Sequence, residues 1–181
     1  HAQSYGWLGW AKNGEQAGTE GLSKRLEAME VVVVKKGSPA PYGTGKDAFI
    51  VKTPSVNYTT HVQTYGWQQK VSDGKDSGTT KQKKRLEGIK IDLSNLPYAG
   101  GVQYRTHVQS FGWQNWVANG ALSGTSGKAK RLEAIQIQLT GEMANKYDIY
   151  YRVHAESYGW LGWAKNGSSA GTEGLHKRLE A

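Results

Sequence analysis

Residues 107–133 read HVQSFGWQNWVANGALSGTSGKAKRLE, and this stretch decides the fold because its pattern occurs four times in the chain. The copies begin at His1, His61, His107 and His154, and they align without a gap over 28 positions. Each copy keeps an aromatic-Gly-Trp motif, an Asn-Gly or Asp-Gly pair, a Gly-Thr pair and a closing Lys-Arg-Leu-Glu. Such self-similarity indicates one structural unit repeated along the chain.

The four copies are not equally alike. Copy 1 (residues 1–28) shares 24 of 28 positions with copy 4 (154–181), 16 with copy 3 (107–134) and 12 with copy 2 (61–88). This order indicates a higher unit of three repeats, in which copy 1 closes one triplet and copies 2 to 4 form the next. We therefore expect the last third of a preceding triplet at 1–35, a Pro- and Gly-containing linker at 36–55, and a triplet lacking its final strand at 56–181, with repeats 56–101, 102–146 and 147–181.

Alternating apolar and polar residues predict short strands rather than helices. Val102, Tyr104 and Val108 alternate with polar residues before the third copy, and the same period recurs at 147–155, 89–93 and 135–139. A period of two is typical of a half-buried strand. Leu132 and Ala134 have the parity opposite to Ile135 and Ile137, which predicts a β-bulge near position 134. The apolar run at 29–34 follows copy 1 and is expected to form the corresponding strand.

The Asn-Gly and Asp-Gly pairs predict tight turns because both residues tolerate positive φ. A unit of three or four short strands cannot bury its apolar side alone, so the copies must pack on one another. The three copies in 56–181 predict an all-β, internally repeated, three-fold pseudo-symmetric domain resembling a β-prism or a β-trefoil. A four-bladed β-propeller is the alternative.

Composition limits the possible functions. The chain has no Cys, which excludes disulfides and thiolate metal sites, and it has no apolar run long enough to span a membrane. It begins with His, and we expect it to be a fragment or a processed segment. No motif typical of a nucleophile, a phosphate loop, a dinucleotide site or a zinc protease occurs. The sequence thus predicts a non-catalytic protein without a cofactor or a metal.

The net charge of +8 favours acidic partners only weakly, since the Lys residues are spread through expected loops. One cluster, at residues 81–85, suggests contact with an acidic polymer, whereas the sequence does not favour nucleic acid as a partner.

Aromatic positions supply the candidate binding residues. The Gly-Trp indole of every copy (Trp7, Trp67, Trp113, Trp160) is expected in the core, because a large ring fills a thin β domain well. The second Trp is replaced by Lys70 in copy 2, which a core position would rarely accept. An indole at this position is suited to stack on a sugar ring or to anchor an interface. The predicted ligand-binding residues are Trp10, Trp116, Trp163, Asn13, Asn119, Asn166, His107, His154 and Gln109.

The Arg-Leu-Glu motif predicts a structural ion pair. Glu133 has the parity of the apolar Ile135 and Ile137, and a partly buried carboxylate needs a partner. Arg131 stands two residues away and is the obvious partner. The His and Gln residues that recur in the copies also have a structural interpretation, as hydrogen-bond partners of turns in neighbouring repeats.

These motifs resemble the ChW family, the clostridial hydrophobic repeat with a conserved Trp. The resemblance rests on residues 107–120, on Gly124-Thr125 and on 131–135, and it covers nearly all the chain outside the expected linker. It implies a module of secreted or surface-attached bacterial proteins that binds cell wall, extracellular carbohydrate or another surface protein. We expect attachment to a polysaccharide or cell-wall polymer, with protein–protein adhesion or assembly as the alternative.

Overall fold

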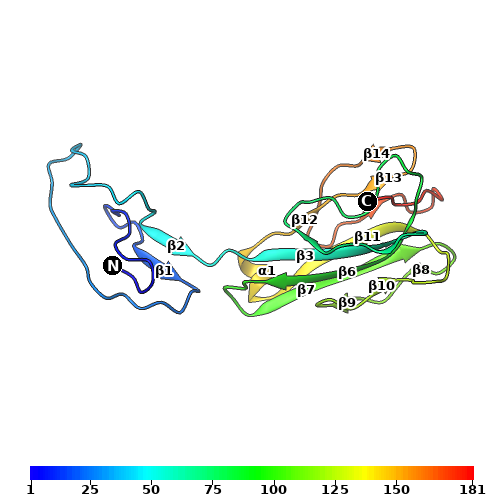
Figure 1. Cartoon of the computed structure of the whole chain (residues 1–181), viewed down its shortest axis with the longest axis horizontal. Helices are drawn as coiled ribbons and strands as arrows, with labels where there is room; N and C mark the ends of the chain where they lie inside the picture. Colours follow the sequence, from blue (N-terminus) through cyan, green and yellow to red (C-terminus); the bar gives the residue numbers. More distant parts are fainter. The chain divides into compact units, whose positions relative to one another are not determined.

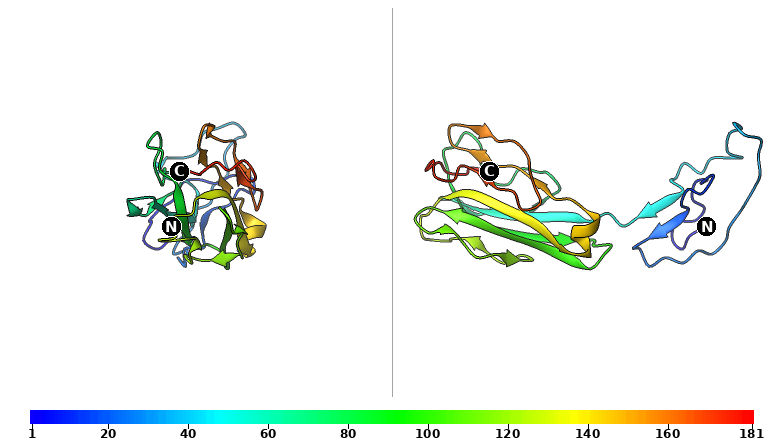
Figure 2. Two further views of the ribbon diagram at one scale, coloured as in Figure 1. Left: turned by 90° about the vertical axis from the view of Figure 1, so that its right-hand side faces the viewer. Right: turned by 180° about the vertical axis from the view of Figure 1, so that it is seen from behind.

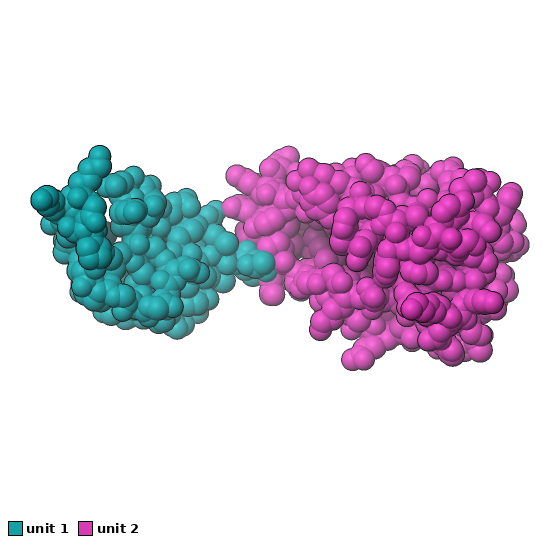
Figure 3. Space-filling model, turned by 90° about the horizontal axis from the view of Figure 1, so that it is seen from above, with its two compact units in different colours: residues 1–53 teal, residues 54–181 magenta.

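Short antiparallel strands make up nearly all the regular structure, and one five-residue helix, α1 (Glu142–Lys146), is the exception. A computed structural model describes residues 1–181. The chain forms two compact units, His1–Thr53 and Pro54–Ala181 (Figure 3). No helix is long and apolar enough to cross a membrane.

Two long hairpin-like pairs form the framework of the second unit. Strand β3 (Ser55–Val62) pairs antiparallel with β6 (Leu86–Ser94), and β7 (Gly100–Val108) pairs antiparallel with β11 (Leu132–Gly141). The four strands run alongside one another (Figures 1 and 2). The register shifts between Leu132 and Ala134, which confirms the predicted bulge.

The middle of each copy folds back onto its own long strand. In copy 2, β4 (Gly66–Trp67) and β5 (Val71–Ser72) pair with β3, and in copy 3, β8 (Gly112–Trp113) and β9 (Val117–Ala118) pair with β7. Copy 4 repeats the arrangement with shorter pairs: β12 (Tyr150–Tyr151) with β15 (Ala164–Lys165), and β13 (His154–Ala155) with β14 (Gly159–Trp160).

The predicted turns are present at every Asn-Gly or Asp-Gly pair. Both residues of each pair have positive φ, for example 45° at Asn119 and 86° at Gly120. These values match the tight hairpin turn expected for this dipeptide. In copies 2 to 4 the turn directly follows the second short strand (β5, β9 or β15) and reverses the chain towards the Gly-Thr pair.

The Gly-Thr pair of each copy in the second unit docks on the backbone of another copy. Strand β10 (Ser123–Gly124) pairs with β6, and β16 (Ala170–Gly171) pairs with β11. The amide N–H of Thr125 donates to the Glu87 carbonyl oxygen at 2.6 Å, and Thr172 donates likewise to Glu133 at 2.7 Å. Thr79 donates to Glu180 at 2.8 Å, so the first copy of the unit also contacts the last.

Glycine is required at these docking points. Gly171 has φ of 140°, and a Cβ there would lie 2.3 Å from the Glu133 carbonyl oxygen. Gly124 and Gly78 are equally confined, because a Cβ at either position would lie 2.5 Å from a Glu backbone oxygen. The Gly-Thr motif is therefore explained by close backbone approach between copies.

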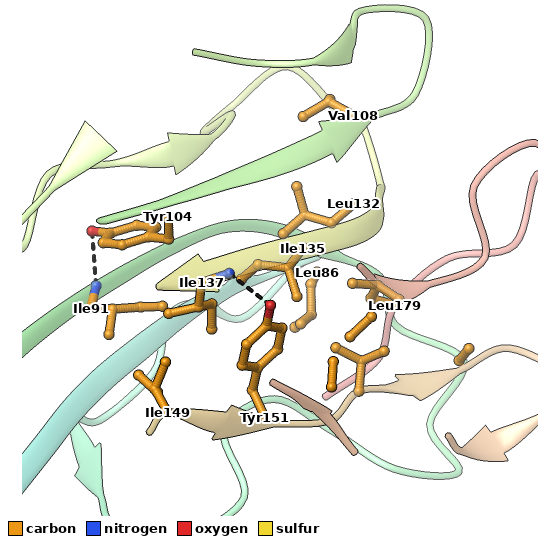
Figure 4. Packing of buried hydrophobic residues seen from close by; sticks show 14 of the residues in the cluster. Leu86, Ile91, Tyr104, Val108, Leu132, Ile135, Ile137, Ile149, Tyr151 and Leu179 are labelled. Carbon is orange, nitrogen blue, oxygen red and sulfur yellow. Dashed lines mark hydrogen bonds between the residues drawn. The ribbon is translucent and has the colours of Figure 1, made fainter. Parts of the chain in front are cut away.

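The core of the second unit lies where its copies meet. Leu86, Leu132 and Leu179 occupy the same position in the three copies and are at most 3% exposed. Their backbones are linked, because Leu86 N–H donates to Leu179 O and Leu179 N–H donates to Leu132 O, both at 2.8 Å. Figure 4 shows the surrounding isoleucines and the buried rings of Tyr104 and Tyr151.

Buried tyrosines connect copies 3 and 4 to the copy before each of them. The Tyr104 hydroxyl accepts from Ile91 N–H at 2.9 Å, and the Tyr151 hydroxyl accepts from Ile137 N–H at 3.0 Å (Figure 4). The same hydroxyls donate to the Ala121 and Ser168 carbonyl oxygens. Burial raises the pKa of both phenols above 10.

The prediction of an all-β, internally repeated fold is confirmed. The strands form two five-stranded sheets and three two-stranded sheets, and the sheets do not close into a barrel. The closed barrel implied by a β-trefoil is therefore absent.

The first unit contains copy 1 and the residues that follow it. Strand β1 (Gly18–Glu20) pairs in parallel with β2 (Phe49–Val51), which lies inside the segment expected to be a linker. The strand predicted at 29–34 is wrong, because these residues are irregular and Val33 is 99% exposed. An apolar run alone does not form a strand where no partner edge satisfies its backbone.

Candidate binding surface of stacked tryptophan and arginine

A charged triad recurs at the start and end of each copy. In copy 3, Glu133 accepts hydrogen bonds from the Arg131 guanidinium through Oε1, at 2.9 Å from Nε and 2.7 Å from a terminal nitrogen. The other oxygen, Oε2, lies 3.0 Å from His107 Nδ1 in a contact that falls short of hydrogen-bond geometry. The Glu133 side chain is only 4% exposed. The predicted Arg–Glu ion pair is therefore present, and the His is a further neighbour of the carboxylate.

The Gly-Trp indole lies beside this triad at the surface. Each ring meets its His edge-on, with ring centroids 5.4 to 5.6 Å apart. Trp7 and Trp67 are 38% and 37% exposed, and Trp113 and Trp160 are half-buried. The prediction that these four indoles fill the core is wrong, because leucine, isoleucine and tyrosine side chains between copies take that place.

An arginine stands between two indoles in copies 3 and 4. The Arg152 guanidinium lies 4.8 Å from the ring centroids of both Trp160 and Trp163. The Arg105 guanidinium lies 5.1 Å from Trp113 and 4.9 Å from Trp116. These distances are typical of cation–π stacking. The two indoles of Gly-Trp-x-x-Trp and one arginine thus form a layered stack, which we call the Trp–Arg–Trp stack.

The arginine was not predicted from the sequence, although a signal was present. Arg105 and Arg152 stand two residues before the His of copies 3 and 4, whereas Thr59 takes that place in copy 2. Among copies 2 to 4, in which this position exists, the two copies with a second Trp carry the arginine and the copy with Lys70 does not. This joint difference suggests that the two positions act together.

Copy 2 has different contacts on the same surface. Lys70 replaces the second indole and forms an ion pair with Asp92 at 2.6 Å. Lys90 lies 4.7 Å from the Trp67 ring centroid, where copies 3 and 4 place arginine. The Thr59 hydroxyl donates to the Gln68 carbonyl oxygen at 2.6 Å.

The predicted asparagines hold turns. Asn119 Oδ1 accepts from Val102 N–H at 3.1 Å, and Asn166 Oδ1 accepts from Ile149 N–H at 3.0 Å. Asn13 is an exposed turn residue of the first unit. The side-chain oxygens of Asn119 and Asn166 are therefore occupied by the backbone of their own repeat.

The remaining predicted residues lie at different distances from the stack. His107 and His154 touch the inner indole of their stack, so they belong to the same surface as Trp116 and Trp163. Gln109 is half-buried on the following turn, and its N–H donates to the Arg131 carbonyl oxygen at 3.0 Å. Trp10 lies in the first unit, edge-on to Tyr42 at 5.4 Å.

Copy 4 presents the most accessible stack. Trp163 is 60% exposed and Tyr150 is 57% exposed. Beside them, Lys165 forms an ion pair with Asp148 at 2.8 Å. Hydrogen bonds from Lys165 and Asn166 hold the pKa of the Asp148 carboxyl below its usual value. Asp148 therefore binds Lys165 and Asn166, and it forms no ion pair with Arg152.

The Gly-Trp motif, the Gly-Thr pair and the Arg–Glu–His triad recur in each copy. The protein family described as Clostridial hydrophobic W (ChW) matches the chain four times, at residues 1–35, 61–95, 107–141 and 154–181. The chain belongs to the ChW family. No curated protein and no solved structure matches it.

Proposed function

We propose that this ChW chain is a non-catalytic binding module of a secreted or surface-attached bacterial protein, and that it attaches to cell-wall or extracellular carbohydrate. The observation that carries the proposal is the Trp–Arg–Trp stack of copy 4, in which Trp163 is 60% exposed. Exposed indoles pack well against the apolar face of a sugar ring, and neighbouring polar groups fix its orientation.

The recurrent carboxylates support a non-catalytic role. Glu87, Glu133 and Glu180 are each paired with an arginine and lie next to a histidine. Glycoside hydrolysis needs two acids at a set separation across the scissile bond. A carboxylate that is paired with an arginine in each repeat fits a structural role better than a catalytic one.

Repetition suits an attachment function. We propose that copies 2 to 4 surround a pseudo-three-fold axis, since their Gly-Thr contacts run from copy to copy and return from the first to the last. Two weak sites on one unit, at copies 3 and 4, bind a long polymer more tightly than either alone.

The test is a titration of the 181-residue chain with purified bacterial cell-wall polysaccharide, followed by tryptophan fluorescence and calorimetry. Trp116→Ala with Trp163→Ala should abolish the shared avidity and lower the affinity by about tenfold or more, since each stacked ring contributes about 1 kcal/mol. Trp67→Ala in copy 2 is the matched control and should leave binding within about twofold. Unchanged binding in the double variant would overturn the site.

A second candidate function, assembly with another protein, is favoured by one groove in the second unit. The groove has a free volume of about 150 Å³ and is lined mainly by apolar side chains, including Tyr58, Ile137, Tyr151 and Val153. Tyr104 and Tyr151 each accept an isoleucine N–H from the preceding copy, whereas Tyr58 donates to Lys75 and accepts no backbone N–H.

This groove fits an extended segment with alternating isoleucines, which would add a strand and supply the N–H for Tyr58. A synthetic peptide with the sequence of residues 132–141 is the probe. Saturable binding that Tyr58→Phe weakens supports assembly through strand addition. Absence of binding, or equal binding of a scrambled peptide, rejects it.

A further inference from the structure

The arginines of the two stacks in copies 3 and 4 have no acidic partner. Neither arginine takes part in the seven ion pairs between Lys or Arg and a carboxylate, and the Arg side chains of the Arg-Leu-Glu motifs are all paired with glutamate. Arg152 makes no hydrogen bond within the chain, and Arg105 uses only its Nε, which donates to Gln136 Oε1 at 2.7 Å. Both arginines therefore keep unused donors.

The indoles determine where those donors are available. Each guanidinium lies 4.8 to 5.1 Å from the centroids of two indoles, which contact it through their π systems, and the N–H donors that no residue of the chain uses are left for a ligand. Stacking also orients the fork, so little side-chain entropy is lost when it binds. A planar fork matches the two oxygens of a carboxylate or a phosphate.

Copy 2 is an internal comparison. It has threonine in place of the arginine and Lys70 in place of the outer indole, and that lysine is neutralised by Asp92 at 2.6 Å. The cation that remains without an acidic partner on this surface of copy 2 is the Lys90 ammonium beside Trp67, whereas copies 3 and 4 present a guanidinium fork beside two indoles.

We infer that the Trp–Arg–Trp stacks of copies 3 and 4 select anionic glycans, in which a sugar ring packs on the outer indole, exposed in Trp163 and half-buried in Trp116, and a carboxylate or phosphate accepts hydrogen bonds from Arg105 or Arg152. This inference rests on the proposed carbohydrate-binding function and names its ligand class. The surplus of cationic residues in the chain, +8 in net charge, attracts such polymers from a distance. The stacks add short-range recognition of the anionic group.

The experiment compares polymers that differ in charge. The 181-residue chain is titrated with polygalacturonate, with its fully methyl-esterified form, and with a glucosyl-substituted polyglycerol phosphate. Polygalacturonate or the glucosylated phosphate polymer should bind at least about tenfold more tightly than the neutral ester, because hydrogen bonds to charged groups contribute about 1.5–3 kcal/mol each. Whether the carboxylate or the phosphate polymer binds better identifies the source of the anion.

Two double variants separate recognition from net charge. Arg105→Met with Arg152→Met removes two charges from the stacks, and Lys70→Met with Lys90→Met removes two charges from copy 2. The arginine variant should lose about tenfold in affinity for the anionic polymer, and the lysine variant at most about twofold. Circular dichroism and the thermal midpoint verify that each variant is folded, and Arg105→Lys with Arg152→Lys replaces the arginine pair if the methionine variant unfolds.

Each outcome decides the inference. Equal losses in the two double variants would show that net charge alone attracts the polymer and would overturn it. Equal affinity for polygalacturonate and its methyl ester would also overturn it, while leaving the proposed carbohydrate binding intact. Failure of all three polymers, together with failure of neutral and acidic cell-wall polysaccharides, would overturn both.

Discussion

Copies 1 and 4 share 24 of 28 residues, yet they are buried to very different degrees. Leu26 is 62% exposed in copy 1, whereas Leu179 at the same position in copy 4 is 1% exposed. The side chain of Glu27 is 32% exposed and that of Glu180 is 6% exposed. The motif itself does not create the core; the neighbouring copies of the second unit do.

The partners of the Gly-Thr strand explain this difference. In copy 4, β16 pairs antiparallel with β11 of the preceding copy. In copy 1, β1 pairs in parallel with β2, a segment of three residues that belongs to no copy. The short strand β2 accepts and donates some of the backbone hydrogen bonds of β1, but it supplies little apolar surface to cover copy 1. Leu26 and the Arg25–Glu27 ion pair therefore stay accessible to water.

The largest expected effect is a loss of folding stability when the equivalent leucines of copies 4 and 1 are truncated. Leu179→Ala should destabilise the second unit by about 2–5 kcal/mol, because it removes a fully buried side chain and leaves a cavity. Leu26→Ala should change the stability of the first unit by at most about 0.5 kcal/mol, since the side chain is mainly in water. Urea unfolding monitored by tryptophan fluorescence measures both. Similar losses in the two variants would contradict the role of the neighbours.

The next effect concerns the ion pair. Glu180→Gln should cost about 1.5–3 kcal/mol, because Arg178 loses a charge-assisted hydrogen bond at a largely buried position and keeps only Glu156 as a carboxylate partner. Glu27→Gln should cost at most about 1 kcal/mol, as expected for an exposed pair. The same unfolding experiment applies, with added salt as a second variable. If salt weakens the wild-type second unit as strongly as the first, the Glu180 pair is not shielded from solvent.

A smaller effect is expected at the docking glycine. Gly171→Ala should cost about 1–3 kcal/mol, since φ is 140° and the new Cβ would lie 2.3 Å from a backbone oxygen. Gly162→Ala is the control, because a Cβ there meets no atom within 4 Å. Hydrogen exchange at the Thr172 amide reports the docking directly. Full protection of that amide in Gly171→Ala would refute the close-approach argument.

The smallest effect is the response to alkaline pH. The pKa values of Tyr104 and Tyr151 are raised by burial above the unfolded value of 10, so the folded state holds these protons more tightly. The resulting stabilisation is complete below about pH 10 and is lost as the pH rises through the folded pKa values. Tyrosinate absorbance in the near ultraviolet should therefore show late-titrating groups in the wild type. Tyr151→Phe should remove one of them, and an unchanged number of late-titrating groups in that variant would contradict the role of burial.

Much of the scaffold follows from local pattern. The period of two at 102–108, the parity change at Ala134 and the Asn-Gly turns predict strands, a bulge and reversals, because each depends on backbone geometry within a few residues. The Arg–Glu pair is predictable for the same reason, since its members stand two residues apart on the chain.

The sequence predictions that failed concern residues whose burial or pairing depends on contacts with distant parts of the chain. Sequence parity cannot tell whether Trp113 faces a neighbouring copy or water, so its position beside His107 at the surface was missed. Residues 29–34 have the apolar character of a strand but meet no partner edge, and they stay irregular. Arg105 was missed because its stack joins two strands, β7 and β8, with the loop that carries Trp116.

The docking of Gly-Thr on a neighbouring backbone has a consequence for the diversification of these repeats. The contact uses main-chain N–H and carbonyl groups and a glycine, so it places almost no demand on which side chains a copy displays elsewhere. A duplicated copy can join an existing array without matching its surface residues. The surface residues can then differ from copy to copy, as the exchange of Trp and Arg for Lys70 and Thr59 in copy 2 illustrates.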